Sequence, residues 1–204
     1  MEDYIQMGLQ VIEHAPDVLF TSSAFTVAFR AALAALTLVQ SDAVFAALDL
    51  IRCVVAHDAL TPSPGQPPEF VPFAAAIRTT VAQQGLTLTG YLLSGLTGDF
   101  PEEASSIVVV IMRMLAAFWP TELLVWLPAV LQQLPAATVP DQAKATFLAD
   151  ITQYVSVTCG IWVGLTFIRS INSKEYDKVK YAVIGLDRAS RKARDRRRKA
   201  AYES

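Results

Sequence analysis

The chain has few of the residues that enzymes and metal sites use. It contains two histidines, His14 and His57, and two cysteines, Cys53 and Cys159, which are too far apart for a metal-type spacing. No GxGxxG, Walker loop, HExxH, GxSxG or CxxC motif occurs. Each histidine falls at an expected helix end, where the side chain commonly caps the helix. We therefore expect no catalytic, cofactor-binding or metal-binding residue, and a protein that is not an enzyme.

Charge is also scarce. Charged residues make up 18% of the chain and hydrophobic residues 53%, which suits a slice of a larger repeat array. No apolar run reaches the roughly twenty residues needed to span a bilayer. Arg113 interrupts Ile107–Trp119, and the uncharged run Tyr154–Ile168 has only fifteen residues. Glu2 and Asp3 stand where a signal peptide would be basic, so we expect neither a leader nor membrane insertion.

Apolar residues recur at three- and four-residue spacing along nearly the whole chain, and little period-two alternation occurs. This periodicity predicts an all-α fold, an α-solenoid of HEAT-like antiparallel helix pairs, with residues 1–204 forming one segment of about four pairs. The expected helices are Glu2–His14, Ala24–Leu38, Ala43–His57, a helix from Phe70–Phe73 towards Gly98, Ile107–Phe118, Leu123–Leu134, Asp141–Tyr154 and Glu175–Ala200. We expect their core to include Leu33, Leu48, Ile51, Leu92, Ile111, Leu115, Leu127, Leu131, Phe147 and Ile184.

Two segments interrupt the helical pattern. Residues 59–72 contain five prolines and a glycine and predict an inter-helix loop, although Pro64 and Pro67 also fit a PxxP docking motif. Residues 154–170 are apolar without an amphipathic stripe. They are either a genuine extra helix or an atypical insert, and the codons that can encode Tyr154-Val155-Ser156 include a splice-donor consensus. A retained intron is therefore one hypothesis for this stretch.

The last expected helix ends in a basic tail, residues 187–204. The tail holds eight Lys/Arg and three Asp/Glu, whereas the rest of the chain holds nine and sixteen. Candidate partner contacts are Arg188, Arg191, Lys192, Arg194, Arg196, Arg197, Arg198 and Lys199. The tail could be a solvated helix end, a contact for an acidic surface, or a nucleic-acid or nuclear-localisation element. Interleaved aromatic residues are absent, so we expect no direct nucleic-acid binding.

The order of several blocks resembles one known family. The most specific blocks are FPEEASSIVVVIMRM, LVWLPAVLQQLP and the closing YDKVKYAVIGLDRASRKARDRRR, which follow MEDYIQMGLQVIEHAPDVLF and FRAALAALTLVQSDAVFAALDLIRCVVAH. This order resembles the C-terminal HEAT repeats of transportin-SR type nuclear import receptors, in the importin-β (karyopherin-β) superfamily. The resemblance covers nearly the whole chain and rests on order and spacing. In the family a short turn stands where residues 154–170 lie.

The resemblance implies a function in protein import. Receptors of this type carry SR-type and other RNA-binding proteins into the nucleus, release them to Ran-GTP, and shuttle between cytoplasm and nucleus. The family protein is several times longer, so Ran-GTP and nucleoporins would bind through the full-length receptor. The first helix pair would then expose apolar surface that a preceding repeat covers. Two alternatives stay open: a helical-repeat adaptor outside nuclear transport, and a membrane-associated helical protein.

Overall fold

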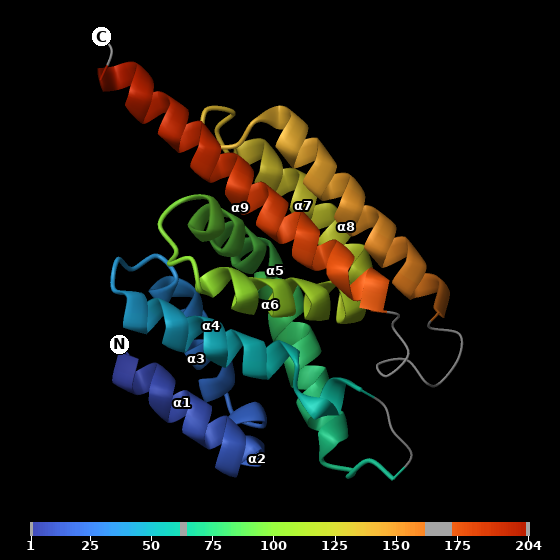
Figure 1. The fold of residues 1–204 in the computed structure, drawn as a ribbon. Helices are drawn as coiled ribbons and strands as arrows, with labels where there is room; N and C mark the ends of the chain where they lie inside the picture. The colour runs from blue at the N-terminus through green and yellow to red at the C-terminus, as the bar shows by residue number, and fades with distance from the viewer. Residues whose placement is uncertain (1, 62–64, 162–172, 203–204) are drawn as a thin grey trace. The chain divides into compact units, whose positions relative to one another are not determined.

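The computed structural model describes residues 2–61, 65–161 and 173–202, shown in Figure 1. The surroundings of side chains are described for 3–61, 65–156 and 177–201. Within these ranges all regular secondary structure is helical, in nine α-helices and one 3-10 helix, so the predicted all-α class is confirmed. The chain divides into two compact units, Met1–Leu92 and Leu93–Ser204, and the boundary falls inside one helix.

Unit 1 (Met1–Leu92) is built around helix α4. Its elements are α1 (Glu2–His14), α2 (Pro16–Phe20), α3 (Ala24–Ala35), α4 (Ser41–Val55), the 3-10 helix η1 (Asp58–Leu60) and the first part of α5 (Phe70–Thr97). Helix α4 packs on both α1 and α3. A Cβ atom at Gly8 would lie 3.0 Å from the Leu50 Cδ1 atom, so glycine at this position lets α1 approach α4 closely.

The core of unit 1 follows the apolar residues that recur at helical spacing on α3 and α4. Those on the inward faces of the two helices, with Leu36 directly after α3, are all buried: Phe25, Phe29, Leu33, Leu36, Val44, Ala47, Leu48, Ile51 and Val55. On α1 the buried line runs through Ile5, Gly8 and Ile12. Tyr4, which the sequence places on this stripe, lies beside the line and is 40% exposed.

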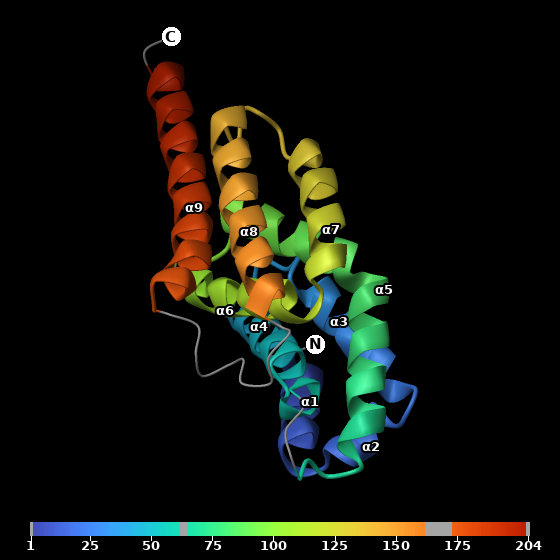
Figure 2. The same ribbon diagram turned by 90° about the vertical axis from the view of Figure 1, so that its right-hand side faces the viewer.

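Unit 2 (Leu93–Ser204) contains the end of α5 and four further helices. These are α6 (Ala104–Phe118), α7 (Pro120–Gln133), α8 (Asp141–Ile161) and α9 (Ser173–Tyr202). Helix α6 packs on α7, α8 and α9, and α8 packs on α7 and α9. Figures 1 and 2 show α8 and α9 side by side, running in opposite directions.

Nine of the ten predicted core residues are buried. In unit 1 these are Leu33, Leu48, Ile51 and Leu92, and in unit 2 Ile111, Leu115, Leu127, Leu131 and Phe147. Ile184 is only half-buried, so that prediction is wrong. The buried line of α9 runs through Val179, Val183 and Leu186, and Ile184 lies at its flank.

Several helix boundaries differ from the sequence-based ones, because prolines begin helices here. Pro16 is the first residue of α2 and Pro120 the first residue of α7. Pro72 is the third residue of α5, inside the region predicted as loop 59–72. A proline in the first helical turn costs no hydrogen bond, since the amide groups there have no intrahelical acceptor. The remaining loop spans Thr61 to Glu69, and residues 62–64 lie outside the described part.

Helix α8 continues through the start of the atypical segment 154–170. It runs without a break from Asp141 to Ile161, and Tyr154 and Val155 are 1% and 2% exposed. Two residues of the segment therefore belong to the core of unit 2. The rest of the expected insert, from residue 162 to 170, lies outside the described residues.

Candidate partner-binding surface

Helix α9 carries all eight sequence-predicted contact residues, and its geometry separates them into two groups. One face of the helix is buried along Val179, Val183, Leu186 and Ser190. Arg191 and Arg194 flank the C-terminal end of this buried line and are half-buried. The other six cations are exposed: Arg188, Lys192, Arg196, Arg197, Arg198 and Lys199. The tail is therefore not one uniform charged strip.

Ser190 and Arg194 fasten α9 to the end of α5. The Ser190 hydroxyl donates a 2.6 Å hydrogen bond to the Thr97 carbonyl, and the Arg194 guanidinium donates one to the Gly98 carbonyl. The last carbonyls of a helix have no intrahelical donor, and cations interact favourably with that end of the helix dipole. Ser190 and Arg194 thus supply the missing donors, and Arg194 adds favourable charge.

A buried carboxylate sets the position of Arg191. Asp187 is 6% exposed, and its carboxylate accepts a 2.8 Å hydrogen bond from the Arg191 Nε–H one helical turn later. This hydrogen bond raises the pKa of Arg191 above its ordinary value, and Glu102 and Glu103 add in the same direction. The pairing satisfies Asp187, which would otherwise be a buried charge without a partner.

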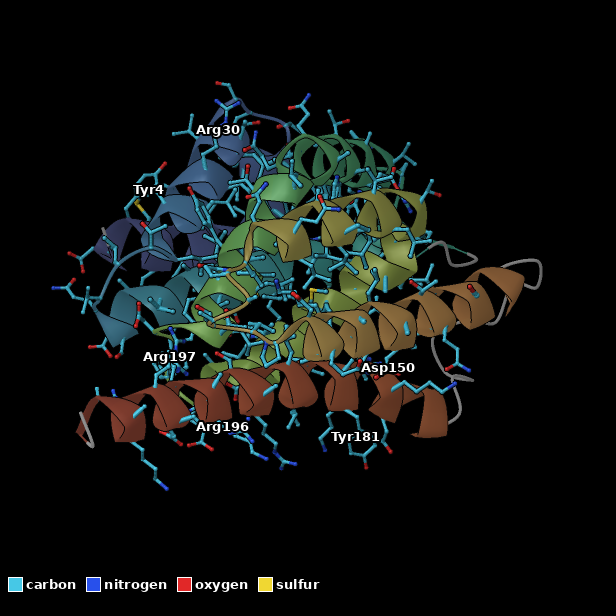
Figure 3. All side chains as sticks on the ribbon, turned by 90° about the horizontal axis from the view of Figure 1, so that it is seen from above. Tyr4, Arg30, Asp150, Tyr181, Arg196 and Arg197 are labelled. Carbon is cyan, nitrogen blue, oxygen red and sulfur yellow. The ribbon has the colours of Figure 1, made fainter. Side chains whose placement is uncertain are left out.

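The C-terminal end of α9 is exposed on every side. Every side chain from Asp195 to Ala201 is exposed, although these residues are helical. The run contains Arg196, Arg197, Arg198 and Lys199 in succession, and Figure 3 shows Arg196 and Arg197 on different sides of the helix. Among the described residues, no ion pair involves any of the six exposed cations. Their charges are therefore available to a partner.

The other candidate residues lie apart from one another. His14 is exposed at the end of α1. The His57 Nδ1 atom accepts a 3.1 Å hydrogen bond from the Ala59 amide, and burial lowers the pKa of His57. Cys53 is half-buried, less than the sequence suggests, and burial raises the pKa of its thiol, which makes it a poor nucleophile. Cys159 lies where side chains are not described.

The described residues offer no metal cluster, and one groove lies between two helices of unit 2. Within residues 2–61, 65–161 and 173–202, no three His, Cys, Asp or Glu residues lie close enough together to hold a metal ion. A groove of about 340 Å³ runs between α8 and α9, lined by Phe147, Asp150, Tyr181 and small residues such as Ala143 and Gly185. None of the described helices is long and apolar enough to cross a membrane.

No model of a known protein family matches the chain, and no curated protein matches it either.

The sequence groups the eight cations but does not identify all the contacts that the structure shows on α9. Arg191 bonds to Asp187, Arg194 bonds to the Gly98 carbonyl, and Ser190 bonds to the Thr97 carbonyl. The Asp187–Arg191 pair has the i,i+4 spacing that favours an ion pair on a helix, so this contact could have been predicted. The contacts with Thr97 and Gly98 join residues more than ninety positions apart, and no local pattern indicates them.

Proposed function

We propose that this chain is the C-terminal part of a transportin-SR type nuclear import receptor, which binds protein cargo through stacked helices. The observation that carries the proposal is the packing of helices that follow one another in sequence, as in α3 with α4, α6 with α7 and α8 with α9. Helical repeats that stack in this way form extended binding surfaces. The order of the sequence blocks, which resembles that family, supplies the cargo class: SR-type and related RNA-binding proteins.

Charge and surface composition support the same proposal. The chain outside residues 187–204 holds nine Lys/Arg and sixteen Asp/Glu, an acidic balance that suits a basic cargo protein. Helix α1 leaves Tyr4 40% and Met7 57% exposed, which is apolar surface of the kind that a neighbouring repeat covers in a solenoid. In this proposal cargo and Ran-GTP favour different curvatures of a flexible array, so that Ran-GTP releases the cargo.

The test uses the protein encoded by the complete transcript. A purified Arg-Ser-rich RNA-binding protein is immobilised, and retention of the receptor is measured with Ran-GTP, with Ran-GDP and with no addition. We expect retention without Ran and with Ran-GDP, and release by Ran-GTP. Equal retention in all three conditions would instead favour the second candidate, a helical-repeat adaptor outside nuclear transport, which the same helix pairing supports.

A further inference from the structure

The exposed end of α9 presents positive charge around its whole circumference. Successive residues of an α-helix are separated by about 100° around the axis, so Arg196, Arg197, Arg198 and Lys199 together cover about 300°. All four side chains are exposed. Further towards the N-terminus, Arg188 and Lys192 extend the positive charge along the face opposite the buried line. Arg188 and Lys199 are ~16 Å apart along the helix axis at 1.5 Å per residue.

This geometry distinguishes between the possible anionic partners. A flat acidic protein surface contacts one face of a helix, so it would leave about half of the cations at positions 196–199 in solvent. A membrane surface would need an apolar face to insert, and among the described residues of α9 the only exposed large hydrophobic side chain is Tyr181. A groove lined by negative charge on both walls can contact all four cations at once.

We propose that the exposed end of α9, Asp195 to Ala201, binds duplex nucleic acid by lying in the major groove of B-form DNA, with Arg188 and Lys192 as further phosphate contacts on the exposed face of the preceding turns. This groove is about 12 Å wide, and an α-helix with its side chains is about 10–12 Å across. Phosphates line both walls, so cations on opposite sides of the helix each reach a backbone. The binding is independent of sequence, because arginine and lysine contacts with phosphates position a protein without reading bases.

The contacts that hold α9 in place do not involve the exposed cations, so these cations can be substituted without loosening the helix. Ser190 and Arg194 hold the helix through Thr97 and Gly98, Arg191 pairs with Asp187 within the helix, and none of the six exposed cations takes part in these bonds. The sequence-based expectation of no direct nucleic-acid binding rests on the absence of stacking aromatics. Aromatic stacking is what single strands require, whereas a duplex is bound through its phosphates.

The test measures the binding of the full 204-residue chain to a fluorescent DNA duplex by anisotropy over a range of salt concentrations. Six phosphate contacts predict a slope of log affinity against log salt of about −5. The quadruple variant R196Q/R197Q/R198Q/K199Q should reduce the slope to about −2. Circular dichroism should show unchanged folding, because the four side chains are exposed.

A matched pair of double variants separates local from overall charge. R197Q/R198Q should lower the magnitude of the slope by about 2. The control R30Q/K180Q removes the same charge from two exposed cations elsewhere, one on α3 and one on the first half of α9, and should leave the slope unchanged. Equal losses in the two variants would overturn the proposal, since binding would then follow net charge alone.

Single variants and competing partners test the groove itself. R196Q, R197Q, R198Q and K199Q should each weaken duplex binding by similar factors, whereas loss confined to neighbouring sides of the helix would overturn the groove arrangement. The other arms use the single strand of the same sequence, an RNA duplex, polyglutamate and anionic vesicles. The DNA duplex should bind most tightly, because the major groove of an RNA duplex is too narrow for a helix. Tighter or equal binding in any other arm, or no duplex binding at low salt, would overturn the proposal.

Discussion

Unit 1 holds the turn after α4 with aromatic rings, whereas unit 2 holds the end of α5 with hydroxyl and charged side chains. In unit 1 the His57 ring lies edge-on to Phe20, with ring centroids 4.9 Å apart, and also contacts Phe70 and Phe73. In unit 2 Ser190 and Arg194 donate to the Thr97 and Gly98 carbonyls. The two units thus cover a helix end with different side chains, aromatic rings in unit 1 and hydroxyl and guanidinium groups in unit 2.

The two units differ at these helix ends. We expect substitutions in their apolar cores to lower the free energy of unfolding by similar amounts. Leu48 in unit 1 and Leu115 in unit 2 are each 0% exposed. Leu48→Ala and Leu115→Ala should each lower the free energy of unfolding by about 2–5 kcal/mol, through lost burial and the cavity left behind. Urea unfolding followed by circular dichroism measures both. Val125→Ala, at a residue 68% exposed, is the control and should change stability by less than about 0.5 kcal/mol.

Two glycines of unit 2 predict opposite changes in stability when alanine replaces them. A Cβ at Gly95 would overlap the ring of Phe100, whose amide donates a 2.9 Å hydrogen bond to the Gly95 carbonyl. Gly95→Ala should therefore cost about 1–3 kcal/mol through overpacking. Gly185→Ala on α9 meets nothing within 4 Å and should instead stabilise the protein, by up to about 1 kcal/mol, through helix propensity. The melting temperature should fall for Gly95→Ala and rise for Gly185→Ala. A fall for both would contradict the prediction that position 185 has room for a Cβ atom.

One aspartate in each unit forms an ion pair with an arginine, and the two ion pairs differ in burial. Asp187 is 6% exposed and pairs with Arg191, whereas Asp49 of unit 1 pairs with Arg52 where the side chains are 41% and 42% exposed. Asp187→Asn should cost about 1 kcal/mol, since Arg191 remains partly in solvent. Asp49→Asn should cost close to nothing. Similar costs for the two, measured by urea unfolding, would show that burial of Asp187 does not strengthen its pair.

The smallest expected effect concerns His57, whose ring contacts aromatic side chains in unit 1. We expect the stability of the protein to depend on pH through this residue. Burial lowers the pKa of His57 in the folded protein, with Asp58 opposing the shift, while the unfolded chain has a pKa near ~6.5. The unfolded state therefore binds the proton more readily, and stability is lost as pH falls below ~6.5 through the folded pKa. Unfolding measured from pH 7.5 to 5.5 should show this loss, and His57→Gln should reduce it. His14→Gln, at an exposed site, should leave it unchanged.

Local patterns in the sequence predicted most of the helices and of the buried residues, and long-range contacts account for most of what they missed. The stripes on α3 and α4 were predictable because each apolar residue recurs at helical spacing. The short helix α2 was missed because Pro16 suggests an end as readily as a beginning. Tyr4 and Ile184 were misplaced because each lies at the flank of a buried line, where neighbouring helices decide exposure. The exposed half of the basic tail was predictable from charge, whereas the half that binds Thr97 and Gly98 was not.

The bond between Ser190 and Thr97 also has a consequence for the order in which the chain folds. These residues are 93 positions apart, so the partner of the Thr97 carbonyl is made long after α5 itself. At about 5–20 residues per second, a ribosome needs roughly 5–20 s to synthesise the intervening chain. During that interval the end of α5 is hydrated, and the core of unit 2 is open along the side that α9 later covers. Completion of unit 2 therefore follows the synthesis of α5 by at least this interval, since it requires α9.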